Sequence, residues 1–153
     1  MTTLTTNNAL EETLTKLETA LLTPVVSGEL KDWLPNVRQA AATFATDWTR
    51  YLNTVLHVEY AQIVETDPEL SAAVEKMIRN DNQLLDQLAK FHEHLHALEQ
   101  RAEQVEWQEN KLAGERERLE ETGIALIVQL KKQRTSAETW LAESLYRDRG
   151  VKD

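Results

Sequence analysis

An apolar stripe that recurs every three and four residues runs through the middle of the chain. Its members are Leu70, Val74, Met77, Asp81, Leu84, Leu88, Phe91, Leu95, Leu98, Ala102 and Val105, all of them apolar except Asp81. Alternating steps of three and four keep one face of an α-helix turned towards its neighbours, as in coiled coils and helical bundles. The pattern therefore predicts a long helix in a bundle with coiled-coil-like packing.

Similar stripes, separated by helix breakers, divide the rest of the chain. They predict helices over residues 8–22, 29–65, 68–105 and 109–148. The first of these begins after Asn7 or Asn8, which are good N-cap residues. The start of the third helix is indicated by Asp67 followed by Pro68, because Asp suits the N-cap and Pro suits the first helical position. We expect Gly150 to stop the last helix.

Pro35 conflicts with a second helix that begins near residue 29. A proline beyond the first turn lacks the N–H that a helix needs at that position. The sequence therefore predicts either a kink near Leu34 or a helix start delayed towards Asp32.

These elements predict an all-α fold, an antiparallel four-helix bundle with three long helices and a shorter N-terminal helix. The chain has 153 residues, with four Gly and three Pro, a composition that favours long helices over strands and turns. Short connections make sequential helices antiparallel. The length fits a single domain over residues 1–153.

The short first helix cannot cover the full length of the other three. We therefore expect one end of the bundle to contain three helices, with apolar surface left for a partner. Leu141 and Leu145 are the predicted contacts there, and a homodimer is the simplest solution because one self-complementary patch covers its own copy. Trp107, in a predicted turn, either caps the bundle or anchors a protein partner.

Composition excludes several classes of function. The net charge of −9 argues against nucleic-acid binding, which requires concentrated Lys and Arg. No segment approaches the length of apolar residues that spans a membrane, and the N-terminus lacks a secretory leader pattern. The chain contains no Cys, so disulfides and thiolate ligands are excluded and a cytoplasmic location is expected.

His92 and His96 form the most conspicuous cluster of possible metal ligands. On a helix they lie one turn apart on one face, with Glu99 nearby, which is a spacing that allows two imidazoles to share a metal. A ferritin-like site would need a second such set on another helix, which the sequence lacks. These histidines thus indicate a metal site, a pH-sensitive histidine, or helix residues with no special role.

Asp81 is the one charged residue in the apolar stripe. Counting from the turns places Asn53 of the second helix and Gln133 and Arg134 of the fourth at a similar level. We therefore expect a polar layer in which Asp81 pairs with Arg134 or accepts hydrogen bonds, and fixes the register of the helices. The alternatives are exposure of Asp81 on a rotated helix and a binding or catalytic carboxylate.

The sequence contains no Ser-His-Asp set, phosphate-binding loop or complete metal site, and no cofactor is predicted. We therefore expect a non-catalytic protein that acts through self-association or as an adaptor or scaffold. The alternative is a metal-binding or redox bundle that uses the face of His92 and His96.

Overall fold

The computed structural model describes the backbone of residues 2–25, 29–104 and 109–152, and the side chains of residues 9–25, 29–103 and 112–144. Its elements are α1 (Thr2–Leu22), α2 (Leu30–Tyr51), the π-helical turn η1 (Leu52–Leu56), α3 (His57–Thr66), the 3-10 turn η2 (Pro68–Leu70), α4 (Ser71–Gln104) and α5 (Glu109–Lys152). Because η1 joins α2 to α3 without a break, these two helices form one long rod. The fold is the predicted all-α bundle with one short and three long helices.

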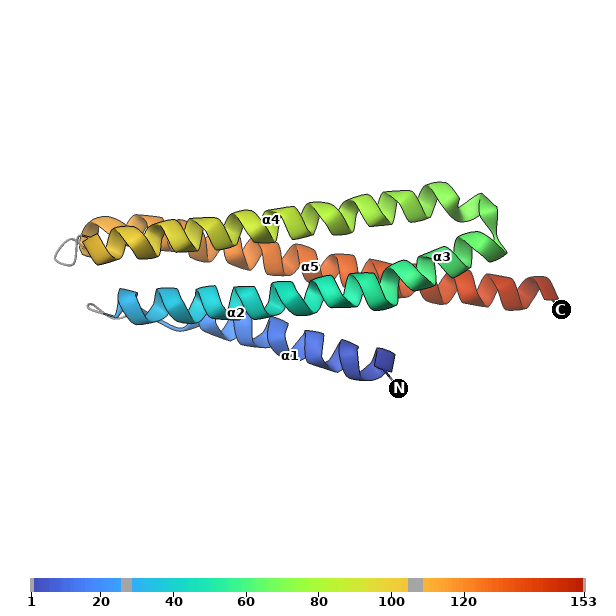
Figure 1. Ribbon diagram of the computed structural model, residues 1–153, viewed down its shortest axis with the longest axis horizontal. Helices are drawn as coiled ribbons and strands as arrows, with labels where there is room; N and C mark the ends of the chain where they lie inside the picture. The colour runs from blue at the N-terminus through green and yellow to red at the C-terminus, as the bar shows by residue number, and fades with distance from the viewer. Residues whose placement is uncertain (1, 26–28, 105–108, 153) are drawn as a thin grey trace.

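The helices pack as sequential antiparallel neighbours (Figure 1). Helix α4 packs against both α2 and α5, and α1 lies against α2 and also against α5. Helix α1 does not extend along α3, whereas α5 continues past the connection between α3 and α4. The bundle thus has four helices over part of its length and three at the end formed by α3, the beginning of α4 and the C-terminal part of α5.

Two predicted helix ends are wrong. Helix α1 begins at Thr2, so neither Asn7 nor Asn8 caps it, and α5 continues through Gly150 to Lys152. Caps and helix propensities are weak local preferences, so they fix a helix end poorly. The start after Asp67 is confirmed: Asp67 has non-helical angles (φ −137°, ψ 86°), and Pro68 is the first residue of η2.

Helix α2 begins at Leu30, so the delayed start that Pro35 suggested is wrong. The backbone N–H groups of Asp32 and Trp33 both donate to the carbonyl oxygen of Glu29, at 3.0 and 3.1 Å. The first turn is therefore closed before Pro35, which stands inside the helix.

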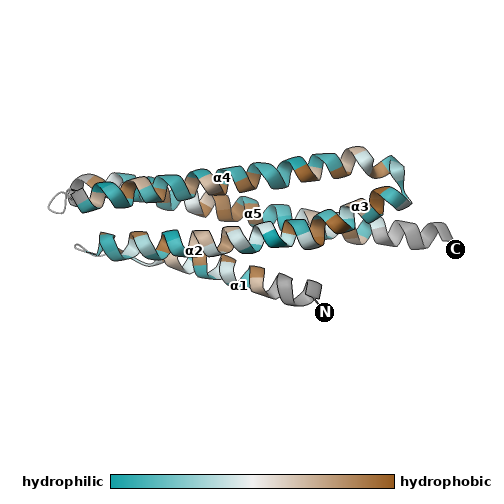
Figure 2. Cartoon of the chain, viewed as in Figure 1, coloured by the Kyte–Doolittle hydropathy of each residue, from teal (hydrophilic) through white to brown (hydrophobic). Residues whose placement is uncertain are grey.

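Hydrophobic side chains recur along each helix and meet along the bundle axis (Figure 2). Trp33 and Trp48 are buried. The ring centroid of Trp48 lies 6.1 Å from that of Phe44 and 5.9 Å from that of Tyr51. Such aromatic contacts add to the stabilisation from apolar burial. Trp140 is partly buried against the same core.

The π-helical turn η1 changes which residues of the second rod face the core. Continued from Trp48 at 3.6 residues per turn, the buried stripe would pass close to Glu59. In the structure Tyr60 and Ile63 are buried instead, and Glu59 is partly exposed. A π turn contains one residue more than an α turn, so the stripe continues about one residue later.

Gly123 allows three helices to approach closely inside the bundle. A Cβ atom at this position would lie 2.9 Å from both Leu21 methyl carbons and 2.9 Å from Phe91 Cζ. Leu21 of α1 and Phe91 of α4 are both buried. Gly114, in the same helix, has no atom within 4 Å of the equivalent position.

We expect Gly114→Ala to raise the free energy of unfolding by up to about 1 kcal/mol, because Ala favours a helix over Gly. Gly123→Ala gains the same propensity but overpacks the core, and should leave the protein about 1–3 kcal/mol less stable than Gly114→Ala. Denaturant titrations of the two variants and the parent measure this difference. An equal gain at both positions would show that α1 does not pack this closely on α5.

Candidate functional site

The polar layer predicted around Asp81 exists inside the bundle. Asp81 has 0% exposed surface although its neighbours along the stripe are apolar. Gln133 of α5 donates a hydrogen bond from Nε2 to Asp81 Oδ1 at 3.1 Å. This hydrogen bond links α4 to α5 at the level that counting from the turns had indicated.

Tyr60 of α3 is a member of this layer that the sequence analysis missed. Its side chain is fully buried, and its hydroxyl lies near enough to Asp81 for each group to influence the pKa of the other. Neither Tyr60 Oη nor Asp81 Oδ2 has a hydrogen-bond partner among the described residues. Placing Tyr60 here required knowledge of the π turn, since a regular helix turns a neighbouring residue inward.

Burial dominates the electrostatics of the layer. It raises the pKa of Asp81 to about 6, against smaller opposing effects of Gln133 and Tyr60. Burial also raises the pKa of Tyr60, and the nearby charge of Asp81 raises it further. Removing a charged group from water disfavours its ionised form, so both groups favour the neutral state.

Of the two alternatives predicted for Asp81, an ion pair with Arg134 or accepted hydrogen bonds, the structure shows a hydrogen bond from the adjacent Gln133. Arg134 is buried and forms ion pairs with Glu11 of α1 and Glu138 of α5, each at 3.6 Å between Nη2 and Oε1. Adjacent residues on a helix point about 100° apart. Gln133 is therefore directed to α4, whereas Arg134 is directed to α1.

Asn53, the third predicted member of the layer, does not belong to it. The residue is exposed and lies within η1. The register change at η1 turns Leu52, Val55 and Leu56 inward. A regular helix continued from the buried Trp48 also turns Leu52 and Val55 inward and Asn53 outward.

His57 and Trp140 extend the layer towards the three-helix end. Their rings flank Tyr60, with centroid distances of 6.2 Å for His57 and 6.1 Å for Trp140. Burial lowers the pKa of His57, and its Nε2 is buried with no hydrogen-bond partner among the described residues. The neutral imidazole is therefore the favoured form at neutral pH.

The residues predicted as metal ligands, His92, His96 and Glu99, do not form a cluster of ligands in the structure. Glu99 forms a hydrogen-bonded ion pair with Arg38 of α2 at 2.5 Å, and exposed His96 lies 3.2 Å from the Gln100 amide nitrogen. His92 is partly exposed. Within the described part of the chain, no three His, Asp or Glu side chains come together as a metal site requires.

The predicted partner contacts fare differently. Leu141 is only 8% exposed and packs within its own chain, so it is not available to a partner in this structure. Trp107 and the side chain of Leu145 lie outside the described residues.

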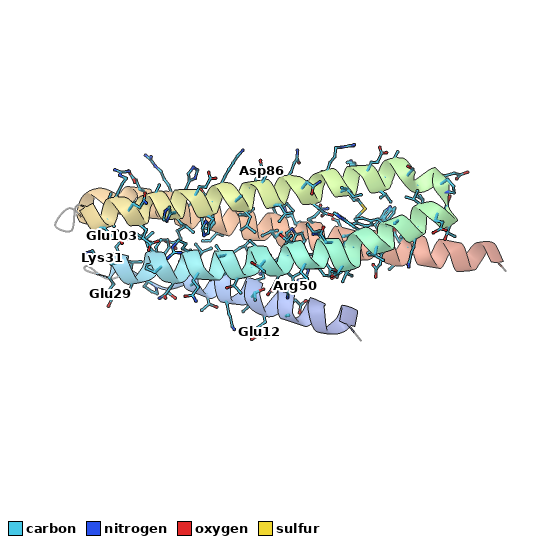
Figure 3. All side chains as sticks on the ribbon, in the orientation of Figure 1. Glu12, Glu29, Lys31, Arg50, Asp86 and Glu103 are labelled. Atoms are coloured by element: carbon cyan, nitrogen blue, oxygen red, sulfur yellow. The ribbon has the colours of Figure 1, made fainter. Side chains whose placement is uncertain are left out.

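Most surface charges point away from the bundle, as the labelled Glu12, Lys31, Arg50 and Asp86 show (Figure 3). Glu12 and Asp86 pair with lysines one turn away at 3.3 and 3.4 Å. Exposed pairs of this kind contribute little to stability. These exposed ion pairs mark solvent-facing sides of the helices and do not indicate a binding site.

A shallow groove of about 550 Å³ lies between α1 and α2 near their connection. Thr15, Thr19, Val25 and Trp33 contribute to its lining, together with the charged Lys16 and Glu29. Its charges are of both signs, so it indicates no ligand class. The sequence analysis did not predict it.

No protein-family model, curated protein or solved structure matches this chain. Among the helices that the structure describes, none has a stretch long and apolar enough to cross a membrane. Asp81 and Tyr60 have no exposed surface, so a substrate cannot reach them in this conformation. The site is therefore an internal polar layer beside the three-helix end.

Gln133→Leu should destabilise the protein by about 1–3 kcal/mol at neutral pH, because it removes a hydrogen bond to a buried carboxylate. The cost should be smaller near pH 4, where Asp81 is protonated. Denaturant titrations at both pH values test this difference. An equal effect at the two pH values would mean that Gln133 stabilises the bundle by packing alone.

Proposed function

We propose that this protein has a non-catalytic role and acts through protein contacts at the three-helix end, where it binds a second copy of itself. The three-helix end comprises residues 57–66 of α3, 71–80 of α4 and 138–144 of α5. The observation that carries the proposal is the short α1, which leaves these residues without a fourth helix (Figure 1).

The apolar surface of this end supports the proposal. Val58 of α3 is 48% exposed. Val64, Met77, Ile78 and Trp140 are only partly buried against the core. Apolar surface that is contiguous and incompletely covered is typical of protein interaction sites, and Trp and Met are favoured residues in interfaces.

A second copy is the partner that we favour. A two-fold dimer places the same incompletely covered surface on both sides of the interface, so each copy supplies the apolar area that the other lacks. Two chains of net charge −9 repel each other, so the apolar contact has to outweigh this repulsion.

The alternative, a metal-binding or redox bundle, has less support because Glu99 is held by Arg38. For a self-associating bundle with no Cys, we propose a cytoplasmic location. An adaptor role for a different protein is the outcome that remains if the chain does not self-associate.

We expect a dimer by light scattering at micromolar concentrations, and Val58→Glu should convert it to a folded monomer because a charge cannot be buried unpaired in the interface. Val128→Glu is the matched control. Val128 is 44% exposed on α5 but lies outside the three-helix end, so this variant should remain dimeric. Circular dichroism verifies that both variants keep their helices.

A protein that is monomeric at about 100 µM would contradict self-association. Equal loss of the dimer in both variants would contradict its placement at the three-helix end.

A further inference from the structure

Two buried oxygen atoms meet in the polar layer without a donor that the structure assigns to them. They are Asp81 Oδ2 and Tyr60 Oη, which are both inaccessible to solvent and have no hydrogen-bond partner among the described residues. An ionised carboxylate has two oxygens that accept hydrogen bonds, and Gln133 serves only Oδ1. The ionised form of Asp81 therefore depends on the neutral Tyr60 hydroxyl for its second oxygen.

Arg134, on the next position of α5 from Gln133, forms ion pairs with Glu11 and Glu138, whose side chains are both more than half exposed. Asp81 accepts its hydrogen bond from a neutral group, the Gln133 amide. Burial therefore disfavours the charged form of Asp81.

We propose that Asp81 is a proton-binding site, and that the neutral carboxyl group donates from Oδ2 to the hydroxyl oxygen of Tyr60 and thereby ties α4 to α3. Ionisation removes this donor and leaves a buried negative charge that faces only two neutral donors, the Gln133 amide and the Tyr60 hydroxyl. The charge then favours opening of the three-helix end to water, because solvation is the readiest compensation for it. The inference concerns the folded monomer and does not depend on self-association.

The other titratable groups around Asp81 define the sign of the effect. On the rod formed by α2, η1 and α3 they are Tyr51, His57 and Glu59, besides Tyr60, and on α5 they are Arg134 and Glu138. The pKa of Tyr51 is raised by burial, so this group stays neutral at any pH of interest.

Asp81 and Glu59 have raised pKa values in the folded state because of burial. The folded state therefore binds their protons more tightly than the unfolded chain does. The resulting stabilisation is fully present below the unfolded pKa of about 4 and is lost as the pH rises through the folded value, about 6 for Asp81.

His57 acts in the opposite direction. Its pKa is lowered by burial, so the unfolded chain binds its proton more tightly, and its contribution to stability is lost as the pH falls below about 6.5. The pH profile of the parent protein thus combines opposing effects. Only a comparison with a variant at position 81 isolates Asp81.

Asp81→Asn is the decisive variant, because the amide is uncharged at every pH and keeps an oxygen that accepts from Gln133. We expect Asp81→Asn to unfold less readily than the parent near pH 7.5 and about as readily near pH 4. The ratio of the two unfolding equilibrium constants should change by roughly a hundredfold between these pH values, as a shift of about two pKa units implies.

Asp86→Asn is the matched control on the same helix. Asp86 is largely exposed and pairs with Lys90. The ratio of the unfolding equilibrium constants of Asp86→Asn and the parent should therefore stay nearly constant with pH. His57→Gln, combined with Asp81→Asn, should remove most of the pH dependence that remains in the single variant.

A direct titration requires no variant. In the parent protein, NMR of the Asp81 carboxyl carbon should give a titration midpoint well above the pH at which an ordinary aspartate titrates. Amide exchange in α3 should accelerate as Asp81 ionises. An ordinary aspartate midpoint, or a ratio for Asp81→Asn that does not change with pH, would overturn the proposal. Repeating these measurements on Val58→Glu, which we expect to be monomeric, separates the proposal from dimerisation.

Discussion

The length of α1 is the constraint on which the rest of the structure depends. Three long helices carry apolar stripes along their whole length, and a helical stripe is stable only when another surface covers it. Helix α1, at 21 residues, covers only part of that length. The four-helix part contains the fully buried Leu10, Leu17 and Leu21, whereas α3 and its neighbours share a thinner core.

The π turn and the polar layer both lie near the transition between these two parts. The extra residue in η1 turns Tyr60 inward towards Asp81, where a regular helix would favour Glu59. Two neutral or neutralisable groups are less costly to bury there than two carboxylates, whose charges would repel each other. A π turn is often found at functional positions in helices, and here it determines which side chain accompanies the buried aspartate.

The fold could be predicted from the sequence because its determinants are local. The period of the stripe, the Asp67–Pro68 start and the shortness of the first helix need no knowledge of distant contacts. The polar layer could be predicted only in part. Counting turns placed the buried Asp81 at the level of Gln133 and Arg134. Which of these two adjacent residues faces Asp81 depends on how α5 is rotated about its axis.

The other errors have similar causes. Tyr60 was missed because a π turn leaves no clear sign in the amino-acid pattern, and Asn53 was placed by its level along the bundle without regard to the face of the helix. The face of His92 and His96 has the spacing of a metal site, yet a single arginine on another helix, Arg38, holds the Glu99 carboxylate. Pairings between helices depend on the rotation of each helix about its axis, which periodicity fixes only to within a residue.

The contact of α1 with α5 determines the order in which the bundle can be completed. Glu18 of α1 pairs with Lys131 of α5 at 2.7 Å, and Leu21 packs on Gly123, so the two outermost helices of the chain meet across more than one hundred residues. Hairpins of neighbouring helices form rapidly because their contacts are local. The face of α1 that packs on α5 must nevertheless wait until residues 123–131 have been synthesised, so the nascent chain exposes Leu21 until then.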